Sequence, residues 1–257
     1  MSHKLHVHDI GSGIPVVFIH GYPLNHAIWG NQDELSDTYH IIAPDLSGFG
    51  TSPALSNLNM ADYADMISGL LDDRKIDKAV VIGHSMGGYI ALAFAERYEN
   101  RLSGLGLVCT QAGADSEEGK VGRLINAERV GKEGFEFIVE TMSGKLLSAA
   151  SDQSDTSLKS RLQAIMKQSS AEGVITALKA MAARKEQFDT LKKLAIPVWV
   201  ASGADDVLIP SEKSVLMTEM LKRAAYQLFD GCGHMPMMEK PQKFNLTLRE
   251  FLSTIRA

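Results

Sequence analysis

The sequence predicts an α/β fold in which a mostly parallel β-sheet is flanked by helices. Short runs rich in Val, Ile and Leu alternate with longer segments of helix-forming residues, and such runs are typical of strands buried on both faces. A glycine-rich turn joins one of these runs directly to an Ala- and Leu-rich segment, which indicates a strand–turn–helix unit. The 257 residues are enough for one large core with an inserted segment.

The composition is that of an ordinary globular protein and argues against two classes of partner. Hydrophobic residues make up 45% of the chain, charged residues make up 22%, and the formal net charge is -5 at pH 7. We therefore do not expect binding to nucleic acid or to an anionic membrane. No apolar run approaches the length of about 20 residues that crosses a bilayer, and residues 1–6 lack a signal-peptide core. The two cysteines, Cys109 and Cys232, do not suggest a disulfide framework, so we predict a cytoplasmic protein.

Apolar runs bounded by turn residues are expected to form the sheet. The first run alternates apolar and polar residues, as an edge strand does, whereas the later runs are almost continuously apolar. The strand-like runs are residues 5–10, 16–19, 40–44, 78–82, 105–109, 196–201 and 226–229. The helices expected beside the sheet are residues 26–35, 59–74, 89–97, 211–221 and 242–255.

A long segment in the middle of the chain has no strand character. Its apolar residues recur at helical spacing, and breaks are expected at Gly131, at the polar residues 151–155 and at Gly173. These breaks divide the segment into about four helices. The predicted division of the chain is a core of residues 1–113 and 195–257 and a helical insertion of residues 114–194.

Ser85 is the strongest candidate for a catalytic residue. It lies between Gly83 and Gly87, where run 78–82 ends and a helix begins, and Met86 follows it. Side chains at the two glycine positions would collide with neighbouring backbone in so sharp a turn, and the turn pushes the serine hydroxyl outward. This G-x-S-x-G pattern is that of a nucleophile elbow. Free N–H groups at the start of the helix would also stabilise an oxyanion.

With this motif at its centre, the chain resembles the α/β-hydrolase family over essentially its whole length. The resemblance implies a mostly parallel, eight-stranded sheet flanked by helices, in which run 105–109 is the sixth strand. It also implies that residues 114–194, inserted after that sixth strand, form a cap that roofs the active site and sets substrate choice.

The resemblance also assigns the partners of the serine. The motif G-x-x-D-x-x-x-P after run 196–201 assigns the acid to Asp206, with Asp205 as the alternative. The base is His234, in a glycine-rich loop between the last strand and the final helix. The order Ser85, Asp206, His234 is that of the family. In such a triad the histidine takes the serine proton, and the aspartate orients the imidazole.

The loop of residues 20–23, His-Gly-Tyr-Pro, resembles the oxyanion loop of the family. By this resemblance the backbone N–H groups of Tyr22 and Met86 are the two oxyanion donors, and the Tyr22 ring borders the pocket. His20 and Asp45 are expected to be structural instead. His20 would hold the loop by hydrogen bonds, and Asp45 lies on the strand that precedes the elbow.

No metal site is predicted. His6 and His8 would point to one face of the first strand, but polar residues commonly alternate along a solvated strand, and no third ligand is close in sequence. The triad chemistry implied by the resemblance needs neither a metal nor an organic cofactor.

The serine narrows the activities that the resemblance implies. Haloalkane dehalogenases and epoxide hydrolases need a carboxylate nucleophile at the elbow, and carbon–carbon bond hydrolases usually carry a different, glycine-rich oxyanion loop. The chain is therefore similar to small carboxylesterases, 3-oxoadipate enol-lactonases and cofactor-free haloperoxidase-type esterases, which implies small ester or lactone substrates. The alternative is a small-molecule receptor or signalling protein of the same fold with little turnover. The sequence makes no prediction of the oligomeric state.

Overall fold

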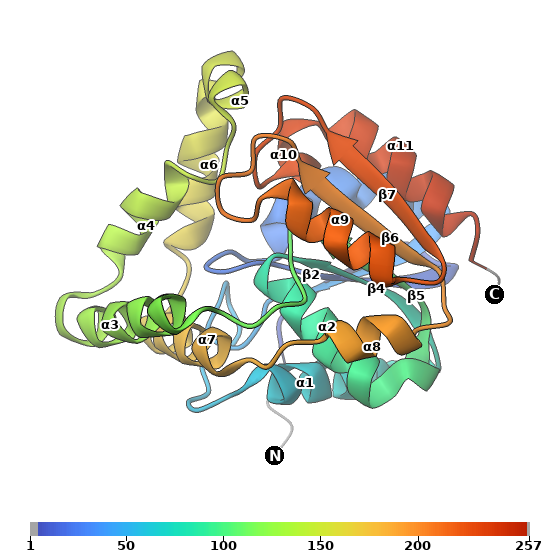
Figure 1. The fold of residues 1–257 in the computed structure, drawn as a ribbon, viewed down its shortest axis with the longest axis horizontal. Helices are drawn as coiled ribbons and strands as arrows, with labels where there is room; N and C mark the ends of the chain where they lie inside the picture. The colour runs from blue at the N-terminus through green and yellow to red at the C-terminus, as the bar shows by residue number, and fades with distance from the viewer. Residues whose placement is uncertain (1–4, 256–257) are drawn as a thin grey trace.

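The computed structural model describes residues 5–255, and a seven-stranded sheet runs through its centre (Figure 1). The strand order is β1-β3-β2-β4-β5-β6-β7. β1 is antiparallel to β3 and every other neighbouring pair is parallel, which confirms the predicted fold class. The strands are β1 (Val7–Ile10), β2 (Ile14–Ile19), β3 (Tyr39–Pro44), β4 (Ala79–His84), β5 (Leu102–Val108), β6 (Val198–Gly203) and β7 (Ala224–Phe229).

Two expectations about the strands are wrong. The sheet in the described part of the chain has seven strands and not eight, and run 105–109 belongs to the fifth strand and not the sixth. Both expectations came from the family resemblance. Among the described residues before β5, no segment other than β1 to β4 forms a strand. The helical insertion therefore follows the fifth strand.

Helices cover both faces of the sheet because side chains alternate along each strand. Val17 and Ile19 of β2 pack in one hydrophobic cluster with α1, α2, α8 and α9, whereas Val16 and Phe18 pack in a second cluster with η1, α10 and α11. Asn59 caps α1, since its side chain accepts the N–H groups of the first turn. These helices are η1 (His26–Asp37), α1 (Met60–Asp73), α2 (Met86–Tyr98), α8 (Phe188–Lys193), α9 (Ser211–Met220), α10 (Pro236–Glu239) and α11 (Pro241–Leu252), and the short η2 (Glu99–Arg101) precedes β5.

Of the helices inserted between β5 and β6, all but α8 stand together beside the sheet, on the left of Figure 1. α3 packs along α7, and α4 and α5 both contact α6, whereas α8 lies against α2 and α9. The inserted helices other than α8 are α3 (Glu117–Glu133), α4 (Glu136–Ser143), α5 (Ala149–Ser154), α6 (Thr156–Met166) and α7 (Ala171–Ala183). In the described part of the chain, no helix is both long and apolar enough to span a bilayer.

The breaks expected at Gly131 and Gly173 are wrong. α3 continues through Gly131 and ends at Gly134, whose φ of 82° is a conformation that glycine adopts easily. Gly173 lies inside α7, where a Cβ would come within 2.5 Å of the carbonyl oxygen of Gly48. This glycine therefore allows close packing of α7 on a loop of the core and does not end a helix.

Candidate active site

Ser85 lies in a strained turn between β4 and α2. Its φ of 52° and ψ of -114° are rare for a residue with a side chain. A Cβ on Gly83 would lie 2.2 Å from the carbonyl oxygen of Gly87, and a Cβ on Gly87 would lie 2.3 Å from that of Ile19. The turn therefore requires both glycines, for the steric reason that the motif suggested. The Thr110 hydroxyl donates to the Ser85 carbonyl at 2.8 Å and holds the turn from below.

Asp206 and His234 lie beyond the carboxyl ends of β6 and β7, as Ser85 lies beyond that of β4. Asp206 Oδ2 lies 2.7 Å from His234 Nδ1, and Asp206 Oδ1 accepts the N–H groups of Leu208 and Ile209. Burial alone would raise the pKa of Asp206, but His234 and these hydrogen bonds outweigh it and hold the pKa below its ordinary value. Asp205 is exposed. Of the two neighbouring carboxylates, the structure therefore places Asp206 against the histidine.

The loop that carries His234 is held by residues that the sequence analysis missed. The Glu239 carboxylate accepts the N–H of Gly233 at 3.0 Å and that of Ser148 at 2.9 Å. His84 Nε2 lies 2.8 Å from the carbonyl oxygen of His234, so the His84 ring donates to this loop. The only signal for Glu239 in the sequence is an acidic residue directly after an apolar run, and for His84 it is its place beside the serine.

The backbone of the oxyanion loop approaches the elbow closely. A Cβ on Gly21 would lie 3.1 Å from the Cβ of Ser85 and 2.6 Å from Nδ1 of His84. Met86 is the first residue of α2, so its N–H has no acceptor within the helix. The N–H of Tyr22 likewise donates to no other residue in the described part of the chain. Both predicted oxyanion donors are therefore available for a ligand.

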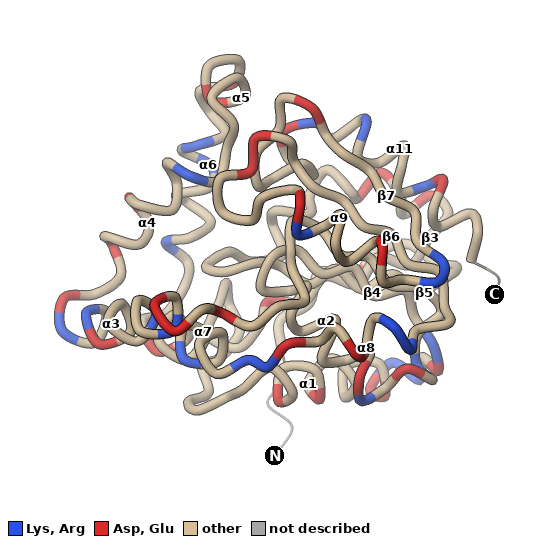
Figure 2. Tube along the Cα trace, in the orientation of Figure 1, with Lys and Arg blue, Asp and Glu red and all other residues tan. Residues whose placement is uncertain are grey.

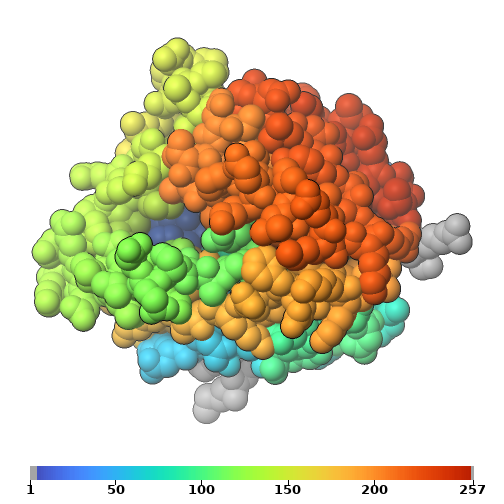
Figure 3. Space-filling model, in the orientation of Figure 1, coloured from blue at the N-terminus to red at the C-terminus, as the bar shows by residue number. Residues whose placement is uncertain are grey.

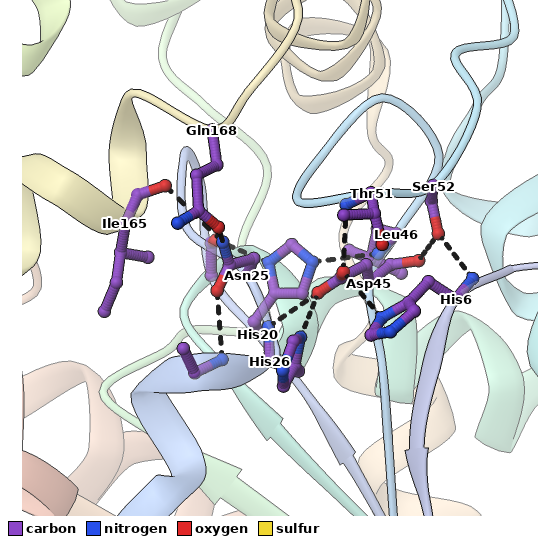
Figure 4. Close-up of polar contacts among 12 residues, drawn as sticks. His6, His20, Asn25, His26, Asp45, Leu46, Thr51, Ser52, Ile165 and Gln168 are labelled. Atoms are coloured by element: carbon purple, nitrogen blue, oxygen red, sulfur yellow. Dashed lines mark hydrogen bonds and ion pairs between the residues drawn. The ribbon is translucent and has the colours of Figure 1, made fainter.

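Hydrogen bonds anchor the oxyanion loop to the core (Figure 4). His20 Nε2 accepts the N–H of Leu46 at 2.9 Å, and its Nδ1 lies 2.9 Å from the carbonyl oxygen of Gly21. Burial lowers the pKa of His20 to about 4, so the ring is neutral near pH 7. Asp45 Oδ1 accepts the backbone N–H of His26 at 2.9 Å and lies 2.6 Å from its Nδ1. These contacts confirm the structural roles predicted for His20 and Asp45.

The same loop also contacts the inserted helices (Figure 4). Gln168 lies just after α6, and its Oε1 accepts a hydrogen bond from the side-chain amide of Asn25 at 2.9 Å. The side-chain oxygen of Asn25 accepts the N–H of Ala27. Ser169 donates to the carbonyl of Pro23 at 3.2 Å. The inserted segment is thus joined by hydrogen bonds to the loop that carries Tyr22.

One group of side chains has the composition of a metal site. Ligand atoms of His6, His26 and Asp45 lie within 4.8 Å of one another, so only His6 of the pair considered in the sequence belongs to this group. In this arrangement, however, both oxygens of Asp45 already accept hydrogen bonds, from His26 and from Thr51 among others. His8 is turned to Asp33 instead, at 2.9 Å. A metal ion could bind only by displacing these hydrogen bonds.

The two cysteines are buried beneath the site. The Cys109 sulfur lies within 4.8 Å of ligand atoms of Asp206 and His234. Burial raises the pKa values of both thiols above their ordinary range. Because metals bind the thiolate, this burial disfavours a metal centre at Cys109.

A cavity of about 330 Å³ opens beside Ser85 and His234. α3, α4 and α7 of the insertion form one side, and Leu208 and Ile209, which follow Asp206, form the other. Tyr22 lines the cavity, as expected from the sequence. The hollow is visible in Figure 3 between the green inserted helices and the orange part of the chain, with blue N-terminal atoms at its base.

The arrangement has the parts that acyl transfer requires. Ser85, Tyr22 and a histidine oriented by a carboxylate line one cavity of small-molecule size, and the N–H groups of Tyr22 and Met86 lie beside the serine in the chain and in the fold. Such a set can support attack on a carbonyl carbon through a covalent serine intermediate.

Comparison with known proteins places this geometry in context. The family model described as alpha/beta hydrolase fold matches residues 14–241. A thermophilic esterase from Thermogutta terrifontis, solved with malate bound, is 35% identical and superposes with a TM-score of 0.96 over 98% of this chain and 94% of that chain. The 2-hydroxy-6-oxo-2,4-heptadienoate hydrolase of Pseudomonas putida is 28% identical over 97% of this chain and 93% of its own length. The enol-lactonase of Burkholderia xenovorans LB400, 22% identical with a TM-score of 0.89 over 97% of this chain and 96% of that chain, shows a shared fold.

Proposed function

The chain is a hydrolase of the alpha/beta hydrolase family, and from this premise we propose that it cleaves carboxylic esters or lactones of small molecules through an acyl-enzyme. The observation that carries the proposal is the Asp206–His234 pair at 2.7 Å, beside a small cavity that both His234 and Ser85 line. The name esterase of the 35% identical Thermogutta terrifontis protein supports it.

In the proposed mechanism, Ser85 Oγ attacks the substrate carbonyl while His234 takes its proton. Asp206 keeps the imidazole in the right tautomer and stabilises the imidazolium that forms. The N–H groups of Tyr22 and Met86 stabilise the oxyanion, each worth about 3 kcal/mol in the transition state. His234 then protonates the leaving alcohol. A water molecule, activated by the same imidazole, cleaves the acyl-enzyme and restores the serine.

We propose that residues 114–194 act as a cap over this chemistry. The candidate triad residues all come from outside this segment, whereas α3, α4 and α7 within it line the cavity. The cap is therefore the part of the chain that selects the substrate.

Carbon–carbon bond hydrolysis is the second candidate. It is favoured by the 28% identity to the 2-hydroxy-6-oxo-2,4-heptadienoate hydrolase, which extends over nearly the whole chain. The loop of residues 20–23, His-Gly-Tyr-Pro, departs from the glycine-rich oxyanion loop usual in such enzymes. Esters and lactones are therefore the first choice.

Turnover by the wild-type protein and by Ser85→Ala tests the proposal. We expect repeated turnover of 4-nitrophenyl esters or simple lactones, complete loss of that turnover in Ser85→Ala, and stoichiometric labelling of Ser85 by a fluorophosphonate probe. Circular dichroism of the variant checks that its fold is kept.

Other outcomes would contradict it. Turnover of 2-hydroxy-6-oxo-2,4-heptadienoate alone would identify a carbon–carbon bond hydrolase. A single burst, or ligand binding that survives the substitution, would favour the receptor. Labelling of a different serine would remove Ser85 from the mechanism.

A further inference from the structure

The fully charged side chains that line the cavity are all positive; the remaining titratable group of basic type is the imidazole of His234. The cavity lining includes Arg123 and Arg129 and no carboxylate among the described residues. Both arginines belong to α3, with Asn126 between them, so their side chains leave the same side of the helix. Figure 2 shows blue and red positions close together along this helix. Whether the arginines carry uncompensated charge therefore depends on their partners.

Arg123 shares its carboxylate partner with a second arginine. Arg123 Nε binds one oxygen of Asp115, and a terminal nitrogen of Arg184 binds the other oxygen at 2.7 Å. The Arg184 side chain is only 3% exposed, and it also donates to the carbonyls of Met181 and Gly113. Two guanidinium groups therefore share one carboxylate, and the cluster of the three side chains carries one net positive charge.

The outer end of Arg123 has no strong acceptor. Its terminal nitrogens have one recorded contact in the described part of the chain, with the sulfur of Met181 at 3.3 Å, and a thioether is a weak acceptor. The side chain is 27% exposed and lines the cavity. A guanidinium fork with free donors is suited to a carboxylate, which it binds with two parallel hydrogen bonds.

The Tyr22 hydroxyl is a second unpaired donor at this cavity. The residue is 8% exposed, and its buried oxygen has no hydrogen-bond partner among the described residues. Burial raises the pKa of this hydroxyl above its ordinary value, so it is protonated and can donate. The positive charge of Arg123 is close enough to this hydroxyl to act against burial and lower its pKa. An unpaired buried hydroxyl is costly, and a bound acceptor would satisfy it.

Arg129 stands at the mouth of the same cavity. It is 48% exposed, forms an ion pair with Glu133, and places its guanidinium 3.9 Å from the centre of the Phe137 ring. Because Arg129 is exposed and already paired, it would contribute little to the affinity for a bound anion. Its position favours an effect on the approach of an anion rather than on its final contacts.

We propose that Arg123 and the Tyr22 hydroxyl form an anion subsite that binds a free carboxylate at the far end of the acyl chain of the substrate. The preferred substrates are then half-esters of dicarboxylic acids, with the ester at Ser85 and the free carboxylate at Arg123. The inference rests on the proposed function, because it concerns the same cavity.

A pair of esters of equal length tests the subsite. Mono(4-nitrophenyl) adipate and 4-nitrophenyl hexanoate have the same acyl chain length, but only the first carries a carboxylate. We expect the wild type to prefer the adipate, and Arg123→Gln to lower the adipate-to-hexanoate ratio of kcat/KM about tenfold or more, because a hydrogen-bonded charge pair is lost. The change should appear mainly in KM, since the carboxylate is bound equally before and during the reaction. Arg123→Lys should retain part of the preference, and Tyr22→Phe should reduce it less.

Lys120→Gln is the matched control. It removes a positive charge from the same helix at a position outside the cavity lining, so the ratio should stay at the wild-type value. A wild-type ratio in Arg123→Gln, or an equal fall in Lys120→Gln, would overturn the subsite. Failure of both esters to turn over would instead contradict the proposed function.

A binding measurement keeps the subsite testable without turnover. In a Ser85→Ala background, calorimetry with monomethyl adipate and with dimethyl adipate compares an anionic and a neutral ligand of one length. Tighter binding of the monoanion that is lost on adding Arg123→Gln supports the subsite. Equal binding of the two ligands refutes it.

Discussion

The two carboxylates that follow β6 are adjacent in sequence and have opposite surroundings. Asp206 is 6% exposed and accepts hydrogen bonds on both oxygens, whereas Asp205 is exposed. The difference arises because the backbone after Gly203 turns immediately, and the N–H of Asp205 donates to the carbonyl of Cys232 at 2.9 Å. That contact joins the loop that carries Asp206 to the loop that carries His234. It leaves only the carboxylate of Asp206 pointing inward.

Asparagine at either position separates the two roles. Asp206→Asn should lower kcat for 4-nitrophenyl butyrate by about four orders of magnitude, because an amide neither stabilises the imidazolium nor keeps the tautomer that accepts the serine proton. Asp205→Asn should stay within about twofold of the wild type, since a solvated carboxylate contributes little. Steady-state kinetics with near-ultraviolet circular dichroism of both variants checks this. The reverse order of activities would move the acid to Asp205.

How much of the site could be predicted depends on the distance in sequence over which each residue acts. The steric requirement for Gly83 comes from the carbonyl of Gly87 in the same turn, so the local motif was enough to predict it. The requirement for Gly87 comes from Ile19 of β2, a contact that the motif does not contain. The roles of Glu239 and Arg123 depend on Ser148 and Asp115, which only the folded chain brings to them. No local pattern carries such a contact.

At the scale of elements, α3 shows what helical spacing does and does not predict. Its apolar residues Val121, Leu124 and Ile125 are 53%, 44% and 59% exposed, whereas Ala127 and Val130 are buried. α3 packs on α7 along one side only, and the arginine side faces the cavity. The pattern therefore predicted that a helix forms, but the side it buries depends on packing within the insertion.

Alanine substitutions at two helical glycines, Gly87 and Gly69, test how closely α2 packs on the backbone of β2 at the elbow. Gly87→Ala should destabilise the protein by more than about 2 kcal/mol, because the new Cβ would lie 2.3 Å from the carbonyl oxygen of Ile19, and backbone cannot yield as a side chain can. Gly69→Ala, inside α1 with nothing within 4 Å, should stabilise by about 0.5 to 1 kcal/mol. Urea unfolding of both variants measures the two changes. Equal changes of the same sign would show that the elbow is not tightly packed.

At the scale of the whole molecule, the alternation of apolar runs and helical segments was enough to predict the fold class, and analogy with the family was a poorer guide to the strand count. The seven strands correspond to runs that the sequence shows. The position of the inserted helices over the sheet edge depends on contacts such as Asn25 with Gln168 and Gly48 with Gly173. Those contacts join residues far apart in the chain, so sequence spacing could not locate them.

Two buried groups make the stability of the fold depend on pH, and they titrate in different ranges. Burial lowers the pKa of His20 from its ordinary 6.5 to about 4, so the unfolded chain binds the proton more readily, and stability falls as the pH drops from about 6.5 to about 4. For Asp45, burial acts to raise the pKa, but the hydrogen bonds from His26 and Thr51 outweigh it, and the pKa falls from 3.8 to about 2. The contribution of Asp45 is therefore present above about pH 4 and is lost as the pH falls toward 2.

Asp45→Asn should separate these two ranges. We expect the variant to be less stable than the wild type at pH 7 and at pH 5, by a similar amount at both, because Asp45 is ionised in both states there. Between pH 4 and pH 2 the difference should shrink by on the order of 1 to 2 kcal/mol, as the wild-type carboxylate takes up its proton. Urea unfolding of both proteins at each pH measures this difference. A gap that stays constant down to pH 2 would mean that the ionised form of Asp45 is not what holds the end of β3 to the start of η1. The hydrogen bonds of Asp45 would then act equally well without the charge.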